Sequence, residues 1–244
     1  MPDVLTVAQA ATQPVNWLVV AASSAVISAA INSFSNWRLR ISDRKREDAA
    51  AALRSAHWQF DLALALEAFA QSASAYMTQI DEALARAADH DPHAFDRVDD
   101  VRLTFDAGSD RPWIELPLAL AGKVRAIPVE MADTARWISD AWVHWADEQE
   151  TYEFERQRAL HYGWVAVELA GDIRREIKLS RSENAWSYRD RFASEFDMIC
   201  QNYLRRQAAG LELDVIPEIE GRLLRAGITP AAASTASVPN DSSI

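Results

Sequence analysis

A histidine and a glutamate four residues apart come closest, in this sequence, to a pattern that could do chemistry. His144 and Glu148 would face the same side of one helix, where they could form an acid–base pair or half of a metal site. A di-metal centre in a helical bundle needs Glu-x-x-His twice, together with two further inward glutamates. Because Glu-x-x-His occurs nowhere in the sequence, we expect ordinary polar pairing at His144 and Glu148.

The other polar clusters predict no chemistry of their own. His90, Asp91 and His93 surround a proline, a composition that turns at helix ends favour without any ligand. The single cysteine, Cys200, shares the apolar stripe of a predicted helix with Phe196, which indicates a buried, inert thiol. One cysteine also excludes a disulfide framework within the chain and a CxxC motif. The sequence therefore predicts no catalytic residue, no metal site and no cofactor.

Glu67 is a carboxylate in an unusually apolar stretch. Between residues 62 and 70 almost every neighbour is alanine, leucine or phenylalanine. If Glu67 points into a core, it must pair with an arginine or be protonated, because burying an unpaired charge is costly. The alternative, which we favour, places Glu67 at the one solvent-facing position of its helix.

Tryptophans and clustered cations are the remaining features that could mark a binding surface. The predicted helices contain Trp58, Trp137, Trp142, Trp145, Trp164 and Trp186. Core packing accounts for most of them, while one or two exposed on a single face would mark a groove for a partner or ligand. Near a predicted helix end lie Arg174, Arg175, Lys178 and Arg181. These cations suit the helix dipole and need no ligand, although contact with anionic lipid would suit them too.

The composition favours a protein made of long helices. Only seven glycines occur in 244 residues, and 49% of the residues are hydrophobic, enough for a core. The net charge of −11 argues against binding to nucleic acid, since phosphates would repel the chain. The sequence therefore predicts an all-α protein with no nucleic-acid partner.

An uncharged segment near the N-terminus predicts a single transmembrane helix over residues 15–37. No charged residue occurs between Asp3 and Arg38, and a span needs about 20 apolar residues. Trp17 and Trp37 would lie about 30 Å apart along a helix, where both indoles could sit at membrane interfaces. The segment is rich in alanine and serine, so an ordinary buried helix is an alternative. A cleaved signal peptide would need its positive charges before the apolar run.

The charges around this segment predict its orientation. No lysine or arginine precedes it, whereas it is followed by Arg38, Arg40, Arg44, Lys45 and Arg46. The positive-inside rule then places residues 1–14 outside the cell's inner (plasma) membrane and residues 38–226 in the cytoplasm. The lipid bilayer is therefore the first expected partner of this single-pass protein.

Small residues within the segment predict a second kind of contact. Ala21, Ala25, Ala29 and Ser33 recur every four residues, a ridge that lets two helix backbones approach closely in lipid. An alanine-rich helix also produces such a ridge by chance. Self-association through the anchor, or binding of a protein partner, is an expectation that the sequence leaves open.

The rest of the chain predicts an antiparallel bundle of three or four long helices. Neither proline nor glycine occurs from residue 38 to 88, and apolar residues recur there at steps of three and four, which predicts one long helix. It should end at the histidine- and proline-containing turn of residues 90–93. The other expected segments are a short irregular or hairpin excursion around 94–127, helices from Pro128 to Ile177, Asn184 to Gln207 and Pro217 to Arg225, and a disordered tail over 227–244.

Every strong signal in the sequence concerns anchoring and helical packing. The sequence therefore predicts a membrane-anchored helical protein that acts as an interaction or scaffolding component at the cytoplasmic face, and not as an enzyme. Two alternatives stay open. The anchor could assemble into an oligomeric pore or channel lined by its serines and Asn32, or the bundle could hold the pocket of an enzyme or small-ligand sensor.

Overall fold

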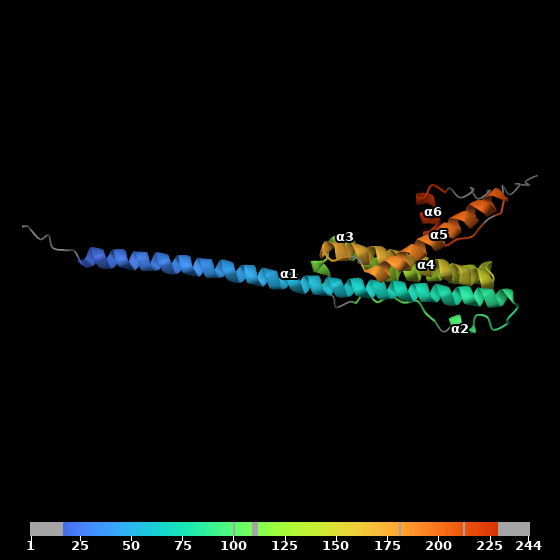
Figure 1. Ribbon diagram of the computed structural model, residues 1–244, viewed down its shortest axis with the longest axis horizontal. Coiled ribbons are helices and arrows are strands. Elements are labelled where there is room, and N and C mark those ends of the chain that lie inside the picture. Colours follow the sequence, from blue (N-terminus) through green and yellow to red (C-terminus); the bar gives the residue numbers. More distant parts are fainter. Residues whose placement is uncertain (1–16, 100, 109–111, 181, 212, 229–244) are drawn as a thin grey trace, which may run out of the picture. The chain divides into compact units, whose positions relative to one another are not determined.

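The chain folds into α-helices joined by short irregular segments. The structure is a computed structural model that describes residues 17–99, 101–108, 112–180, 182–211 and 213–228. Its elements are α1 (Trp17–Ala88), α2 (Asp96–Asp99), the 3-10 turn η1 (Trp113–Glu115), α3 (Leu118–His144), α4 (Glu148–Glu176), α5 (Glu183–Ala208) and α6 (Pro217–Arg225) (Figure 1). No strand occurs among the described residues, and the prediction of an all-α protein is confirmed.

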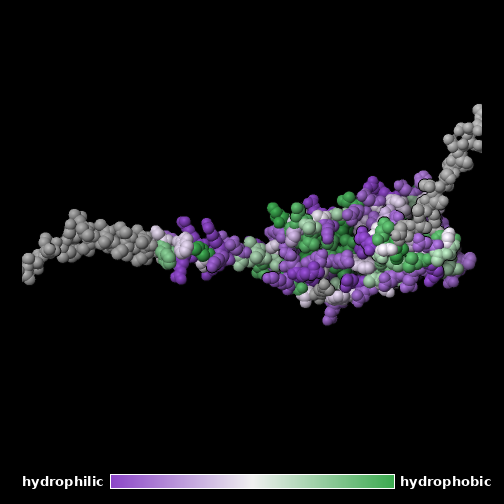
Figure 2. Space-filling model, turned by 90° about the horizontal axis from the view of Figure 1, so that it is seen from above, coloured by the Kyte–Doolittle hydropathy of each residue, from purple (hydrophilic) through white to green (hydrophobic). Residues whose placement is uncertain are grey.

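Two compact units divide the chain, residues 1–54 and residues 55–244. The first unit contains the N-terminal part of α1, where every described side chain except Ile41 is exposed. The second unit contains the hydrophobic core. On the face that Figure 2 shows, its surface is largely hydrophilic with separate hydrophobic patches. Among the residues whose side chains the structure describes, which in α1 begin at residue 32, no helix has both the length and the hydropathy that crossing a bilayer requires.

α4 is the central helix of the second unit. Its five consecutive residues 159–163 are all buried, which requires neighbours on every side of the helix. Three pairs bring α1 and α4 together: Glu67–Arg174, Ala73–Gly163 and Asp81–Arg156. Because rising numbers on α1 meet falling numbers on α4, the two helices run antiparallel. α3 also runs antiparallel to α4, through Thr134–Tyr162 and Trp137–Phe154. The predicted bundle of long helices is therefore confirmed.

The helix expected from Pro128 to Ile177 is two helices, and this prediction was wrong at its start and in its middle. α3 begins earlier, at Leu118, and contains Pro128 in its interior. The buried residues of α3 recur at steps of three and four on both sides of Pro128. Burial of this stripe outweighs the cost of an interior proline, about 3 kcal/mol.

The break between α3 and α4 is fixed by a helix cap. The Glu150 backbone N–H donates to Asp147 Oδ1 (2.8 Å), and the Asp147 backbone N–H donates to Glu150 Oε2 (3.0 Å). This reciprocal capping box starts a new helix after the Asp147 position. As a result His144 ends α3 and Glu148 begins α4.

After α1 the chain reverses direction and packs against the side of α1. α1 ends where His90 adopts a φ of 65°, and the Asp91 N–H bonds back to the Arg86 carbonyl (3.1 Å), the pattern of a Schellman turn. Farther on, Phe105 contacts Phe69, with ring centroids 5.2 Å apart. The excursion expected around 94–127 contains the short α2 and η1, is otherwise irregular in its described residues, and ends earlier than expected, where α3 begins at Leu118. The hairpin alternative was wrong, because no strand occurs among these described residues.

The two C-terminal helices lie where the sequence predicted them. α5 and α6 match the expected ranges to within one residue at each end. The described part of the chain ends at Ile228, so the predicted disordered tail over 227–244 lies almost entirely outside it.

Candidate functional site

The predicted anchor residues belong to the first part of α1. Trp17, Ala21, Ala25 and Ala29 are helical, and their side chains lie outside the described part of the structure. Farther along, Ser33 and Trp37 are exposed. The ring of Trp37 contacts that of Phe34, at 5.8 Å between centroids. The predicted basic flank follows on the same helix, and its side chains are all exposed: Arg38, Arg40, Arg44, Lys45 and Arg46.

The pairing of His144 and Glu148 on one helix was wrong, because the capped break at residues 145–147 separates them. The turn around His93 is held by local contacts: its backbone N–H donates to Asp91 Oδ1 (3.0 Å) and its Nδ1 lies 3.1 Å from Asp96 Oδ2. Among the described residues, no three histidine, cysteine or carboxylate side chains form a group that could hold a metal ion.

Cys200 is partly buried and packs against the core. Burial, and to a smaller extent the Asp197 carboxylate, raises the pKa of its thiol above the ordinary value. A raised thiol pKa leaves little thiolate at neutral pH, which weakens the side chain as a nucleophile.

Glu67 faces α4 and not solvent, so the interpretation that we favoured was wrong and its alternative holds. Arg174 donates two hydrogen bonds to the carboxylate, Nε to Oε1 at 2.6 Å and Nη2 to Oε2 at 3.1 Å. The two side chains are only 13% and 11% exposed. This bidentate ion pair ties α1 to the C-terminal end of α4 and forms part of the wall of a groove.

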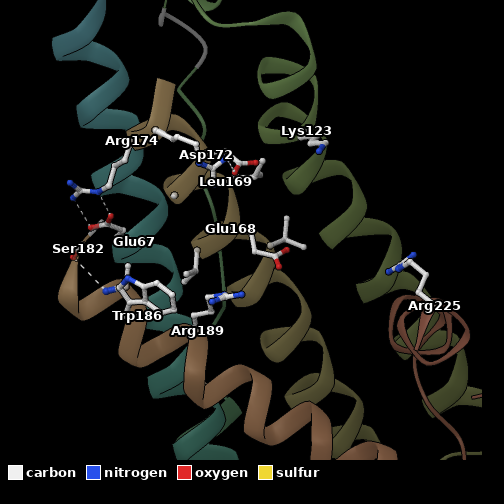
Figure 3. A pocket seen from close by; sticks show the side chains of 15 residues that line it. Glu67, Lys123, Glu168, Leu169, Asp172, Arg174, Ser182, Trp186, Arg189 and Arg225 are labelled. Atoms are coloured by element: carbon white, nitrogen blue, oxygen red, sulfur yellow. Dashed lines mark hydrogen bonds and ion pairs between the residues drawn. The ribbon is translucent and has the colours of Figure 1, made fainter. Parts of the chain in front are cut away.

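The groove has a volume of about 710 Å³ and is lined by side chains from α1, α3, α4, α5 and α6 (Figure 3). Such a volume is typical of pockets for small organic ligands. Part of its apolar lining comes from Trp186, which is 38% exposed. The Arg189 guanidinium lies over the Trp186 ring, 5.1 Å from its centroid. One exposed tryptophan therefore does line a groove.

The charges in the groove are unequal. Its lining has three acidic side chains, Glu67, Glu168 and Asp172, and five basic ones, Lys123, Arg174, Arg175, Arg189 and Arg225. Two of these cations are neutralised locally, by the Arg174–Glu67 pair and by Arg175–Asp172 at 2.9 Å. The groove thus has two positive charges in excess, in a chain whose net charge is −11.

A buried polar cluster holds α6 beside α3 and α4. The Thr134 hydroxyl lies 2.8 Å from the Tyr162 hydroxyl and also contacts the Glu218 carboxylate. Tyr162 donates to Glu218 Oε1 at 3.2 Å. Burial raises the pKa of the Tyr162 hydroxyl, so the hydroxyl keeps its proton and stays a donor at neutral pH.

His161 forms the second polar contact with α6. The Arg222 Nε–H donates to His161 Nδ1 (3.1 Å), and the same guanidinium lies over the Trp164 ring, 4.5 Å from its centroid. Burial first, and then the charges of Arg222 and Arg225, lower the pKa of His161 to about 3. His161 is therefore neutral and acts as a hydrogen-bond acceptor, a structural role.

The groove could not be predicted from the sequence, because its cations come from α3, α4, α5 and α6 and no local spacing connects them. The partial signals were the cluster at residues 174–181, of which Arg174 and Arg175 line the groove, and the expectation that an exposed tryptophan would mark a groove, which Trp186 fulfils. Comparison of the chain with protein-family models, with curated proteins and with solved structures finds no match.

Proposed function

We propose that this chain is a membrane-tethered helical protein that binds a partner at the cytoplasmic face of the membrane. The observation that carries the proposal is the continuity of α1 from Trp17 to Ala88. One helix contains residues 17–37 of the uncharged segment, the exposed basic run and the first buried residues of the bundle. A span inserted at residues 15–37 would therefore continue into the helix that contributes the first buried residues of the bundle.

The exposed basic run supports the orientation of this tether. Exposed arginine and lysine side chains can interact with anionic headgroups on the cytoplasmic side of the bilayer. The anchor ridge of Ala21, Ala25, Ala29 and Ser33 would add self-association in lipid. The pore alternative rests on the same segment and gains no separate support.

Exposed apolar side chains on the body support binding of a protein partner. Trp142, Val143 and Trp145 lie at the end of α3, and they are 51%, 69% and 51% exposed. Exposed large apolar side chains are typical of interaction sites. The segment around the break between α3 and α4 is where we expect a partner protein to bind.

A second candidate function is the binding of a small ligand within the bundle. The groove beside α4 favours it, since it combines a ligand-sized volume with an exposed tryptophan and convergent charges. The two functions are compatible, because the tether and the groove involve different residues.

Reporter fusions and a deletion test the tethered function in cells. A reporter active only in the cytoplasm, fused after residue 50 of the full chain, should give signal. Activity there of a reporter that works only outside the cytoplasm would overturn the orientation. Deleting residues 1–37 should release a folded helical protein from the membrane fraction, and persistent sedimentation of the folded body with membranes would overturn the assignment of the anchor.

A further inference from the structure

We propose that the groove beside α4 binds an organic anion, a phosphate-type group attached to a flat apolar body. This inference rests on the second candidate function, ligand binding in the bundle, and adds the chemical class of the ligand. The phosphate could belong to a free small molecule or to a lipid headgroup, and the experiment below distinguishes the two sources.

Three cations of the groove that form no ion pair are the first argument for an anionic ligand. Lys123 of α3, Arg189 of α5 and Arg225 of α6 approach the groove from different helices (Figure 3). None of the ion pairs in the described part of the chain involves any of these three cations. Among the acidic lining residues, Glu168 likewise forms no ion pair with a described cation. Three unpaired cations and one unpaired carboxylate leave two positive charges, which a dianion would balance. Arginine and lysine are the side chains that proteins use to bind phosphate.

Arg225 also acts on a neighbouring buried group. Burial first, and then the charges of Arg222 and Arg225, lower the pKa of His161, so positive potential from Arg225 reaches this side of the bundle. At Arg222, whose pKa is lowered mainly by burial, the opposing effect of Glu168 is larger than that of Arg225.

Trp186 supplies the apolar part of the site. Its indole is 38% exposed, although a tryptophan gains more free energy from full burial. The Arg189 guanidinium covers it at 5.1 Å. A planar ring held against the indole would place its anionic substituent next to this guanidinium, so that stacking and ion pairing act together.

Gly171 keeps the groove open. It lies inside α4, where glycine costs about 1 kcal/mol relative to alanine. A Cβ atom at Gly171 would meet no atom within 4 Å, so close packing does not require glycine here. Gly171 also lines the groove, and a large side chain at this position would fill the space that a ligand needs.

Binding of two matched probes to the full chain tests the proposal. The protein is reconstituted in phosphatidylcholine nanodiscs, and equilibrium dialysis measures binding of 1-naphthyl phosphate and of uncharged 1-naphthol, each corrected with protein-free discs. We expect the phosphate to bind about ten-fold more tightly, the effect of one additional charge-assisted contact. Discs that contain phosphatidylglycerol identify the source: competition by this lipid assigns the groove to headgroup phosphates, and unchanged binding assigns it to soluble anions.

Two pairs of variants locate the binding. The double variant Arg189→Gln/Arg225→Gln should weaken binding of naphthyl phosphate about ten-fold and leave naphthol unchanged, while Arg206→Gln, an exposed α5 arginine outside the groove, should change neither. Gly171→Leu should abolish binding of both probes, whereas Gly122→Leu, whose Cβ also meets open space, should not. Melting curves confirm that each variant is folded.

The outcomes separate the two levels of the proposal. Equal affinity for both probes, lost in Gly171→Leu, would overturn the anion preference and keep ligand binding in the groove. If neither probe binds, or if Gly171→Leu binds like the wild type, the ligand-binding function and the anion preference both fail.

Discussion

Gly163 of α4 lies so close to Phe192 of α5 that a Cβ atom at Gly163 would stand 2.6 Å from Phe192 Cζ. The same atom would lie 2.9 Å from the Cβ of Ala73 on α1. Phe192 is completely buried and the Ala73 Cβ is fixed to its backbone, so neither can move away easily. The meeting of three helices at this point therefore depends on the absence of a side chain at Gly163.

Replacing Gly163 with alanine should destabilise the protein, although alanine is the better helix former. We expect a loss of about 1–3 kcal/mol in the free energy of unfolding, the usual cost of overpacking a core. Gly171→Ala in the same helix is the matched control, because its Cβ meets open space, and it should gain up to about 1 kcal/mol. Denaturant unfolding measures both. Stabilisation by both alanines would show that α1, α4 and α5 do not pack as described.

Local patterns in the sequence predicted the helices, but they could not predict contacts between residues far apart in the sequence. The run without glycine or proline to residue 88 and the Pro217 start of α6 act within a few residues, so they were visible. The capping box at Asp147 was visible too, as Asp-x-x-Glu, and was missed. Gly163 is visible in the sequence as a glycine within a helical stretch, but its contact with Phe192 depends on packing between helices. The same holds for Glu67, whose partner Arg174 is 107 residues away.

His161 should make stability depend on pH. Its pKa is about 3 in the folded protein, against about 6.5 when unfolded, so between these values only the unfolded chain takes up a proton. The contribution of His161 is complete above pH 6.5 and is lost as the pH falls toward 3. His161→Asn keeps an acceptor for Arg222 and removes the titration. From pH 6 to 4, the wild type should lose stability faster than the variant, by at most about 1.4 kcal/mol per pH unit. Parallel curves would show that His161 is accessible to protons.

Replacing Lys178 with glycine should stabilise the protein. Lys178 lies two residues after the end of α4 and has a φ of 58°. It belongs to a Schellman turn in which the Leu179 N–H bonds to the Arg174 carbonyl at 2.8 Å. Because a left-handed conformation costs an L-residue about 1–2 kcal/mol, Lys178→Gly should raise the free energy of unfolding by about 1 kcal/mol. Lys178→Ala keeps the strain and should bring no comparable gain. Equal melting temperatures for the two variants would contradict the turn geometry.

Ala25 tests the proposed self-association of the anchor. A leucine at this position would push two helix backbones apart and remove close packing that lipid does not restore, while insertion into the bilayer should hold or improve. Energy transfer between tagged full-length copies in membranes should therefore fall for Ala25→Leu and persist for the control Ile27→Leu. Equal energy transfer in the wild type and both variants would show that the spacing of the small residues results from the high alanine content of the segment. The pore alternative would then have no support.

The tether itself is tested most directly by measuring the depth of residue 27 in a bilayer. A nitroxide label is attached at Ile27→Cys, and separately at Leu53→Cys, in full-length protein with Cys200→Ser, reconstituted into lipid. Leu53 is the reference because its side chain is 61% exposed. If residues 15–37 span the membrane, the label at residue 27 should be relaxed strongly by oxygen and weakly by a water-soluble nickel chelate, with the reverse at residue 53. Equal accessibility of both labels to the nickel chelate would place this part of α1 in water and contradict the membrane tether.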